Sequence, residues 1–149
     1  MEVREKTAET GFKQKAIKMI AASSAIADAI GETDTQVIFS YGIVPEDAGG
    51  PKCCISAEEA VSGISEENPF YKKQILVVTI WCRRDYIDDN GVNRMDMIEE
   101  ELNRLFNRFQ SIGRGDMKLI STWEEPAGSV YNKRVMRFQS MEPLRRQGA

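Results

Sequence analysis

The sequence predicts an α+β fold with two layers, a mostly antiparallel sheet of about five strands packed by two helices. Apolar runs rich in β-branched residues predict the strands, and apolar residues that recur at three- and four-residue steps predict the helices. The links over residues 41–52 and 123–130 are short and contain no helix, so the strands that they join are expected to be antiparallel. The predicted order is α-β-β-β-α-β-β, without an internal repeat.

The 149 residues are expected to form a single domain, 1–149, because that length is typical of one domain and is enough to bury a core. Residues 1–9 are charged and lack periodicity, which predicts a loose N-terminal arm. Residues 142–149 contain a proline and a pair of arginines, which predicts a basic C-terminal tail.

Residues 71–84 are predicted to form the central strand, because they contain no Gly or Pro and their middle is β-branched and aromatic. Both faces of this strand are apolar. A strand of that kind is covered on both sides, by a helix, by a second layer or by another subunit. One face carries Leu76, Val78, Ile80 and Cys82, and the other carries Ile75, Val77, Thr79 and Trp81.

The second helix is predicted to follow an acidic turn over residues 85–91. Asn93 is a good N-cap residue for it, with Asp96 three positions further on. Gly113 is expected to end the helix. Its apolar face, which should pack on the central strand, consists of Met95, Ile98, Leu102, Leu105, Phe106 and Phe109.

The remaining elements are less strongly marked. Residues 10–30 are predicted to form one amphipathic helix that ends at Gly31. The segment 58–70 is polar and allows two interpretations, a long hairpin loop or a mobile arm. Further strands are predicted over residues 37–41, 52–57, 117–123 and 130–139.

The cysteines and the N-terminus predict folding in a reducing cytoplasm. No run approaches about 18 consecutive apolar residues, the length of a membrane-spanning helix. The charged N-terminus also lacks the apolar core of a signal peptide. Three cysteines, two of them adjacent, make a poor disulfide framework. We therefore expect Cys53, Cys54 and Cys82 to be reduced, structural thiols.

The residues that carry chemistry are mostly missing. The chain has no histidine, which removes the commonest general base and every Ser-His or Cys-His pairing, although chemistry with carboxylates alone stays open. The acidic turn does not fit an EF-hand, because setting Gly91 at the sixth loop position puts Tyr86 at the first and Met97 at the twelfth. We expect no catalytic residue, no metal, no cofactor and no enzymatic activity.

Charge is unevenly distributed along the chain. Residues 1–70 carry 12 acids against 6 bases, whereas residues 71–149 carry 11 acids against 14 bases. The asymmetry is mild and suits either a chance distribution or two ends that meet differently charged neighbours. A basic aromatic sheet surface is also conceivable, but the net charge of −3 argues against a sequence-specific nucleic-acid reader. That surface would combine Trp81, Arg83, Arg84, Tyr131, Lys133, Arg134 and Arg137.

The order of elements resembles that of the tail terminator (tail completion) and related head-tail joining proteins of tailed bacteriophages. The resemblance covers residues 12–141 and rests on topology and length, without a signature motif. It implies a non-enzymatic subunit of a ring, commonly a hexamer, in the neck of the virion at the head-proximal end of the tail. Assembly in the host cytoplasm is implied as well. The implied partners are further copies of the chain, the tail tube protein and the head-completion or connector proteins, with no membrane.

On this resemblance, the loops over residues 45–51 and 58–70 become candidate arms between subunits, with ordinary surface loops as the equal alternative. The basic last strand and the C-terminal arginines would face an acidic neighbour or passing DNA, without reading its sequence. The candidate contact residues are Pro45, Glu46, Asp47, Gly49, Glu66, Glu67, Phe70, Trp81, Arg83, Arg145 and Arg146.

Other functions stay open beside the terminator. A head-completion or neck connector subunit is also a small ring-forming α+β domain. A non-viral binding module with a two-layer sheet would stay monomeric and gain stability with its ligand, whereas a ring-forming subunit would associate with itself. An enzyme would show a pocket with a carboxylate of strongly raised pKa.

Overall fold

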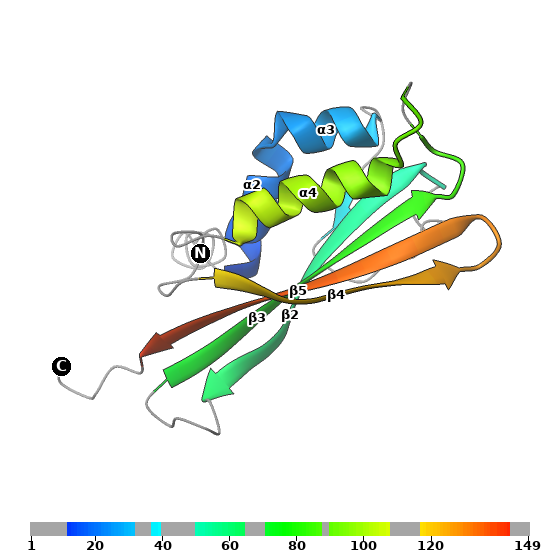
Figure 1. Ribbon diagram of the computed structural model, residues 1–149. Coiled ribbons are helices and arrows are strands. Elements are labelled where there is room, and N and C mark those ends of the chain that lie inside the picture. The colour runs from blue at the N-terminus through cyan, green and yellow to red at the C-terminus, as the bar shows by residue number, and fades with distance from the viewer. Residues whose placement is uncertain are drawn as a thin grey trace, which may run out of the picture.

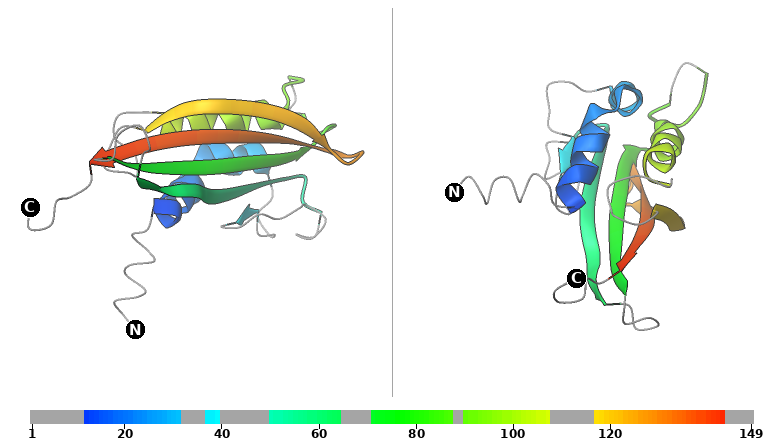
Figure 2. Two further views of the ribbon diagram at one scale, coloured as in Figure 1. Left: turned by 90° about the horizontal axis from the view of Figure 1, so that it is seen from below. Right: turned by 90° about the vertical axis from the view of Figure 1, so that its left-hand side faces the viewer.

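The computed structural model of the protein describes residues 12–31, 37–39, 50–64, 71–87, 90–107 and 117–143. Within them, helices cover one face of a five-stranded sheet and leave the other face open (Figures 1 and 2). The predicted two-layer α+β fold is confirmed, with three helices in place of the two expected. The elements are α2 (Phe12–Ala22), α3 (Ser24–Ile30), β1 (Ile38–Phe39), β2 (Cys53–Ile64), β3 (Tyr71–Arg83), α4 (Arg94–Phe106), β4 (Met117–Ala127) and β5 (Tyr131–Pro143).

The sheet has the strand order β1-β2-β3-β5-β4, and every pair except β1 with β2 is antiparallel. The prediction that the link over residues 41–52 joins antiparallel strands is therefore wrong. Ile38 lies opposite Ile55 and Phe39 opposite Ser56 in a parallel pair. The chain between β1 and β2 spans about a dozen residues, which is enough for a crossover that returns the second strand in the same direction.

Strand β2 is longer than predicted. It runs without interruption through residues 58–64, which the sequence left as a loop or an arm, and it contains a bulge between Glu59 and Val61. Glu58 and Glu59 are exposed there. Adjacent residues of a strand point to opposite sides of the sheet, so both sides are exposed at this part of β2, and the apolar alternation that reveals a strand is missing there.

Strand β3 lies at the centre of the sheet, between β2 and β5. The face predicted to be the purer of the two, which begins at Leu76 and ends at Cys82, is fully buried under the helices. On the other face, Val77, Thr79 and Trp81 are only half-buried. The expectation that both sides of β3 are covered therefore holds for only one side within a single copy of the chain.

The N-terminal helical segment breaks at Ser23 into α2 and α3, so the prediction of one continuous helix over residues 10–30 is wrong. Ser23 has an extended backbone, and its hydroxyl accepts a hydrogen bond of 3.2 Å from the amide of Ile26. The same hydroxyl donates to Glu101 of α4 over 3.2 Å. Serine competes with the helical backbone in this way and therefore favours a helix start over a helix interior.

Helix α4 begins as predicted at the N-cap Asn93, whose side chain accepts a 2.7 Å hydrogen bond from the amide of Met95. It ends at Phe106, earlier than the expected Gly113, and the predicted core residue Phe109 lies outside the described residues. The rings of Phe106 and Phe138 meet edge to face at 5.4 Å, which joins the helix to β5. The buried face of α4 consists of Met95, Ile98, Leu102, Leu105 and Phe106.

The final hairpin is longer than predicted, because β4 and β5 pair from Ala127 opposite Tyr131 up to Met117 opposite Ser140. Much of the predicted turn over residues 123–130 therefore belongs to β4. Strand β5 extends to Pro143, so the predicted tail 142–149 begins inside the strand. The rest of that tail and the predicted arm 1–9 lie outside the described residues.

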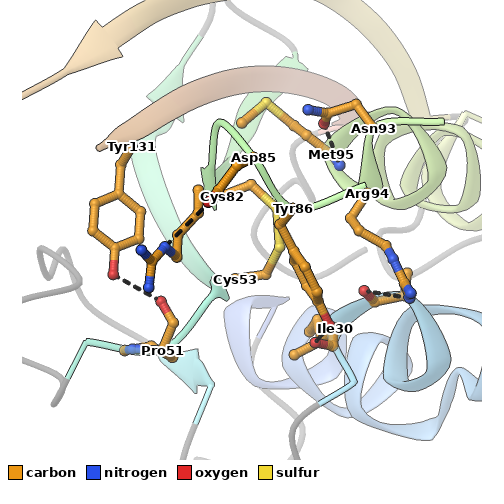
Figure 3. The surroundings of a disulfide bond; sticks show 12 residues. Ile30, Pro51, Cys53, Cys82, Asp85, Tyr86, Asn93, Arg94, Met95 and Tyr131 are labelled. Atoms are coloured by element: carbon orange, nitrogen blue, oxygen red, sulfur yellow. Dashed lines mark hydrogen bonds and ion pairs between the residues drawn. A yellow bond between two sulfur atoms is a disulfide. The ribbon is translucent and has the colours of Figure 1, made fainter. Parts of the chain in front are cut away.

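Cys53 and Cys82 are joined by a disulfide, with their Cα atoms 4.2 Å apart (Figure 3). The expectation of three reduced thiols is wrong for these two residues. They lie directly opposite each other on β2 and β3, a juxtaposition that depends on strand register and not on sequence spacing. Cys54, whose side chain belongs to the other face of the sheet, is buried and takes no part in the disulfide.

Candidate interaction surface

The candidate site is the open face, defined as the side of the sheet opposite the helices (Figure 2). Side chains alternate across a strand, so the odd-numbered residues of β3 and β5 share this side. Strand β4 adds its own residues through its pairing with β5. The residues that β3, β4 and β5 contribute to the open face include Val77, Thr79, Trp81, Arg83, Lys118, Trp123, Glu125, Tyr131, Lys133, Val135 and Arg137.

Two aromatic rings on the open face each carry a cation. Lys133 lies opposite Trp81 in the register, and its Nζ is 5.3 Å from the centre of the indole. Arg137 Cζ lies 5.5 Å from the ring centre of Trp123 on the neighbouring strand. At partly exposed sites each such pair contributes about 0.5–1 kcal/mol. The pairs hold the basic side chains flat against the sheet.

Only some of the basic side chains on the open face are neutralised by carboxylates. Lys133 Nζ is 2.9 Å from Glu125 Oε1, and Arg83 Nε is 3.6 Å from Asp85 Oδ1. Lys118 and Arg137 form no ion pair within the part of the chain that the structure describes. The open face thus retains positive charge on its β5–β4 side.

The open face also exposes apolar surface. Trp123 is 40% exposed on this face. On β3, Val77 and Trp81 are half-buried. The indole N–H of Trp81 is shielded from solvent and has no hydrogen-bond acceptor among the described residues. Aromatic and arginine side chains together are typical of protein interfaces.

The helical face carries an acidic patch made by Asp96, Glu99 and Glu100 of α4 with Glu124 of β4. Arg134, which projects from β5 toward the helices, pairs with three of these carboxylates. Its Nη1 lies 2.7 Å from Asp96 and 3.3 Å from Glu99, and its Nη2 contacts Glu124. Three carboxylates around one guanidinium leave this patch negative, and Glu100, which lines the groove beside α3, adds a further negative charge on the same helix.

The environment of Arg134 explains its protonation. Burial is the largest single influence and by itself lowers the pKa of Arg134, but hydrogen bonds to Asp96 and Glu124 and the charge of Glu99 outweigh it, so the pKa is raised. The side chain is only 15% exposed. Arg134 therefore stays charged and ties α4 to the β4–β5 hairpin.

A groove of about 360 Å³ runs between α3 and α4, lined by Ala25, Met97, Glu100, Glu101 and Arg104. Arg104 Nε donates to Glu101 Oε2 over 2.9 Å. Hydrogen bonding by Arg104, the largest influence, lowers the pKa of Glu101, and the Ser23 hydroxyl adds to the effect against partial burial. The Arg104–Glu101 pair lies within α4, and the hydrogen bond from Ser23 to Glu101 links this helix to the start of α3.

The residues singled out in the sequence fall into two groups. Trp81 and Arg83 lie together on the open face, whereas Arg134, which the sequence grouped with them, lies on the helical face. Arg84 points to the end of the sheet, where it donates to Asn132 and to the carbonyl of Gly128. Outside the described residues lie Pro45, Glu46, Asp47, Gly49, Glu66, Glu67, Phe70, Arg145 and Arg146.

Sequence inspection missed Trp123 and the acidic patch. The signal for Trp123 was present, because Ser121, Trp123 and Glu125 alternate along β4 in the manner of an outward-facing side. The acidic patch was visible as Asp96, Glu99 and Glu100 at helical spacing, but nothing in the sequence shows that Arg134 reaches them.

Within the described ranges, no group of three or more Cys, Asp or Glu side chains is arranged to hold a metal ion. The helices of the same ranges are too short or too polar to cross a membrane.

Comparison with known proteins identifies a family and a shared fold. The model of the YomW family matches residues 10–140. A chain in the solved structure "Virion of native gene transfer agent (GTA) particle" has a similar fold, with a TM-score of 0.58 and 9% sequence identity. That alignment covers 87% of this chain and 92% of the other. The comparison with curated proteins found no match.

Proposed function

Because the chain belongs to the YomW family, we propose that it is a structural subunit of a phage-type virion. The observation that carries the proposal is the shared fold with a chain of a gene transfer agent virion, over nearly the whole length of both chains. The family name is itself of phage origin. Likeness of fold is an analogy, so the role needs its own test.

Within the virion, we propose the role of a ring-forming tail terminator that caps the tail tube and joins it to the head. The order of elements supports this role, since it follows the arrangement expected from such proteins. The half-buried open face supports self-association, because an apolar sheet face gains stability when a partner covers it. The partners would be further copies in a ring, commonly six, the tail tube protein and the connector of the head.

We propose further that the chain has no catalytic activity. The chain has no histidine, and Glu101, the carboxylate with a pKa shift among the described residues, forms an ion pair with Arg104 within α4. In the described residues the pKa of Glu101 is lowered, whereas a carboxylate acting as a general acid needs a raised pKa.

Electron microscopy of particles assembled without this chain tests the role. If the chain terminates tails, tubes of uncontrolled length should accumulate beside tailless heads, and adding the purified protein should restore their normal length. Tails of normal length that fail to join filled heads would instead favour a head-completion subunit. Normal, complete particles would contradict a structural role.

A further inference from the structure

Two patches on opposite faces of the molecule carry opposite charge that the described residues leave uncompensated. On the open face, Lys118 lies opposite Gln139, two residues from Arg137 on the same side of β5. We name Lys118, Trp123 and Arg137 the basic patch. On the helical face, the acidic patch retains an excess of carboxylates over Arg134. Glu100 in that patch is exposed and forms no ion pair in the described ranges.

We infer that two copies of this chain associate face to back, with the basic patch of one copy against the acidic patch of the next. This inference rests on the proposed self-assembling function and specifies which surfaces meet. Contact between two open faces would bring like charges together, which disfavours a symmetric dimer. A face-to-back contact uses two different surfaces, so its repetition produces a closed ring or a filament.

The basic patch also supplies the apolar core that a stable contact needs. Trp123, a member of the patch, is 40% exposed. Burying its indole removes apolar surface from water, while the charges around it set the orientation and speed of association. Interfaces commonly place an aromatic or arginine side chain at such a centre.

Duplex DNA fits the open face less well than a second copy does. Arg83 and Lys133 already lie beside carboxylates, so a phosphate backbone would meet negative charge as well as positive. Binding to DNA gains its strength from cations that neutralise phosphates. A protein surface with carboxylates at chosen positions satisfies Lys118 and Arg137 without that conflict.

A charge exchange tests the inference. Arg137→Glu and Glu100→Lys, each alone, should weaken self-association, measured by light scattering and sedimentation, by about 10-fold or more. The double variant Arg137→Glu/Glu100→Lys recreates the pair with reversed signs and should return the dissociation constant to within about threefold of the original. Rising salt should weaken the original pair and the reversed pair alike.

Lys18→Glu is the matched control, since it makes the same change of charge on an exposed position of α2 and should leave self-association unchanged. Circular dichroism should show all variants folded.

A wild-type chain that stays monomeric, single variants without effect, or a double variant that restores nothing would each overturn the inference. The inference would also be overturned if the Arg137→Glu variant lost binding to a labelled DNA duplex while its native mass stayed equal to that of the wild type. Failure of the exchange in a self-associating protein overturns the interface alone, whereas complete particles formed without the chain contradict the function.

Discussion

Gly31 shows how one residue fixes the contact between the helical layer and the β3–α4 loop. Its φ is 72°, and a Cβ atom built there would lie 2.5 Å from the hydroxyl of Tyr86. That hydroxyl donates a 2.8 Å hydrogen bond to the carbonyl of Ile30 (Figure 3). Arg94 lies over the Tyr86 ring and donates to the carbonyls at the end of α3, where its charge also suits the helix dipole.

Gly31→Ala should lower the free energy of unfolding by about 2–3 kcal/mol, because the left-handed backbone and the displaced Tyr86 hydroxyl each add a cost. Gly128→Ala is the control, since Gly128 has a φ of 73° but nothing within 4 Å of the added atom. Denaturant unfolding compares the two. Equal losses would mean that the contact with Tyr86 contributes nothing.

Glu101 makes stability depend on pH. Its folded-state pKa is lowered, chiefly by Arg104, from an ordinary value of 4.5. The contribution is therefore fully present above about pH 4.5 and is lost as the pH falls through the folded pKa. Glu101→Gln should lower the free energy of unfolding by about 0.5 kcal/mol at pH 7, a small effect because Arg104 is largely exposed, and the loss should vanish in acid. Denaturant unfolding at pH 7 and in acid measures this difference, and a loss of the same size at both would contradict the assignment.

At the scale of elements, helices and strands with strong local patterns could be predicted from the sequence, whereas the pairing between strands could not. Strand β3 and helix α4 have long, regular apolar patterns, and both were predicted with nearly correct starting points. The break at Ser23 has a local cause, the hydrogen bond from the amide of Ile26 to its hydroxyl, but serine also occurs inside helices, and its second partner, Glu101, is distant in sequence. The parallel pairing of β1 and the extension of β2 depend on which strand lies beside each, and no local pattern contains that information.

The same limit applies to the candidate site. Trp81 and Arg83 were predicted to share a basic aromatic surface of the sheet, and they do lie together on the open face. The pairing of Trp123 with Arg137 requires the register of β4 on β5, including the bulge near Ile120. Arg134 was misplaced although alternation along β5 separates it from Arg137.

The disulfide joins β2 to β3 and should strengthen that pair. It closes a loop with a sequence separation of 29, for which the chain-entropy estimate is about 3–4 kcal/mol. Reductant should therefore lower the melting temperature of the wild type but leave Cys53→Ala/Cys82→Ala unchanged. Cys54→Ala should keep the response. Alkylation of the denatured, unreduced protein should label one thiol per chain, and labelling of all three would contradict the disulfide.

At the scale of the whole molecule, the proposed function requires a folded subunit whose open face meets another copy. Val77 tests this, because it is half-buried on the open face while its neighbour Val78 is fully buried under the helices. Val77→Asp should leave a folded chain that no longer associates. Val78→Asp should unfold the chain, since an unpaired carboxylate would enter the core. Circular dichroism and light scattering separate the two outcomes, and an unfolded Val77→Asp variant would count against the interface.

The native mass of the purified protein, followed by light scattering over a range of concentration and salt, tests the central proposal most directly. A ring-forming subunit should reach a closed, defined mass of about six copies that stops growing at higher concentration. High salt should shift the equilibrium back toward monomer, because the contact joins opposite charges. A chain that remains monomeric at every concentration and salt, both alone and in the presence of assembled tail tubes, would contradict the proposed ring.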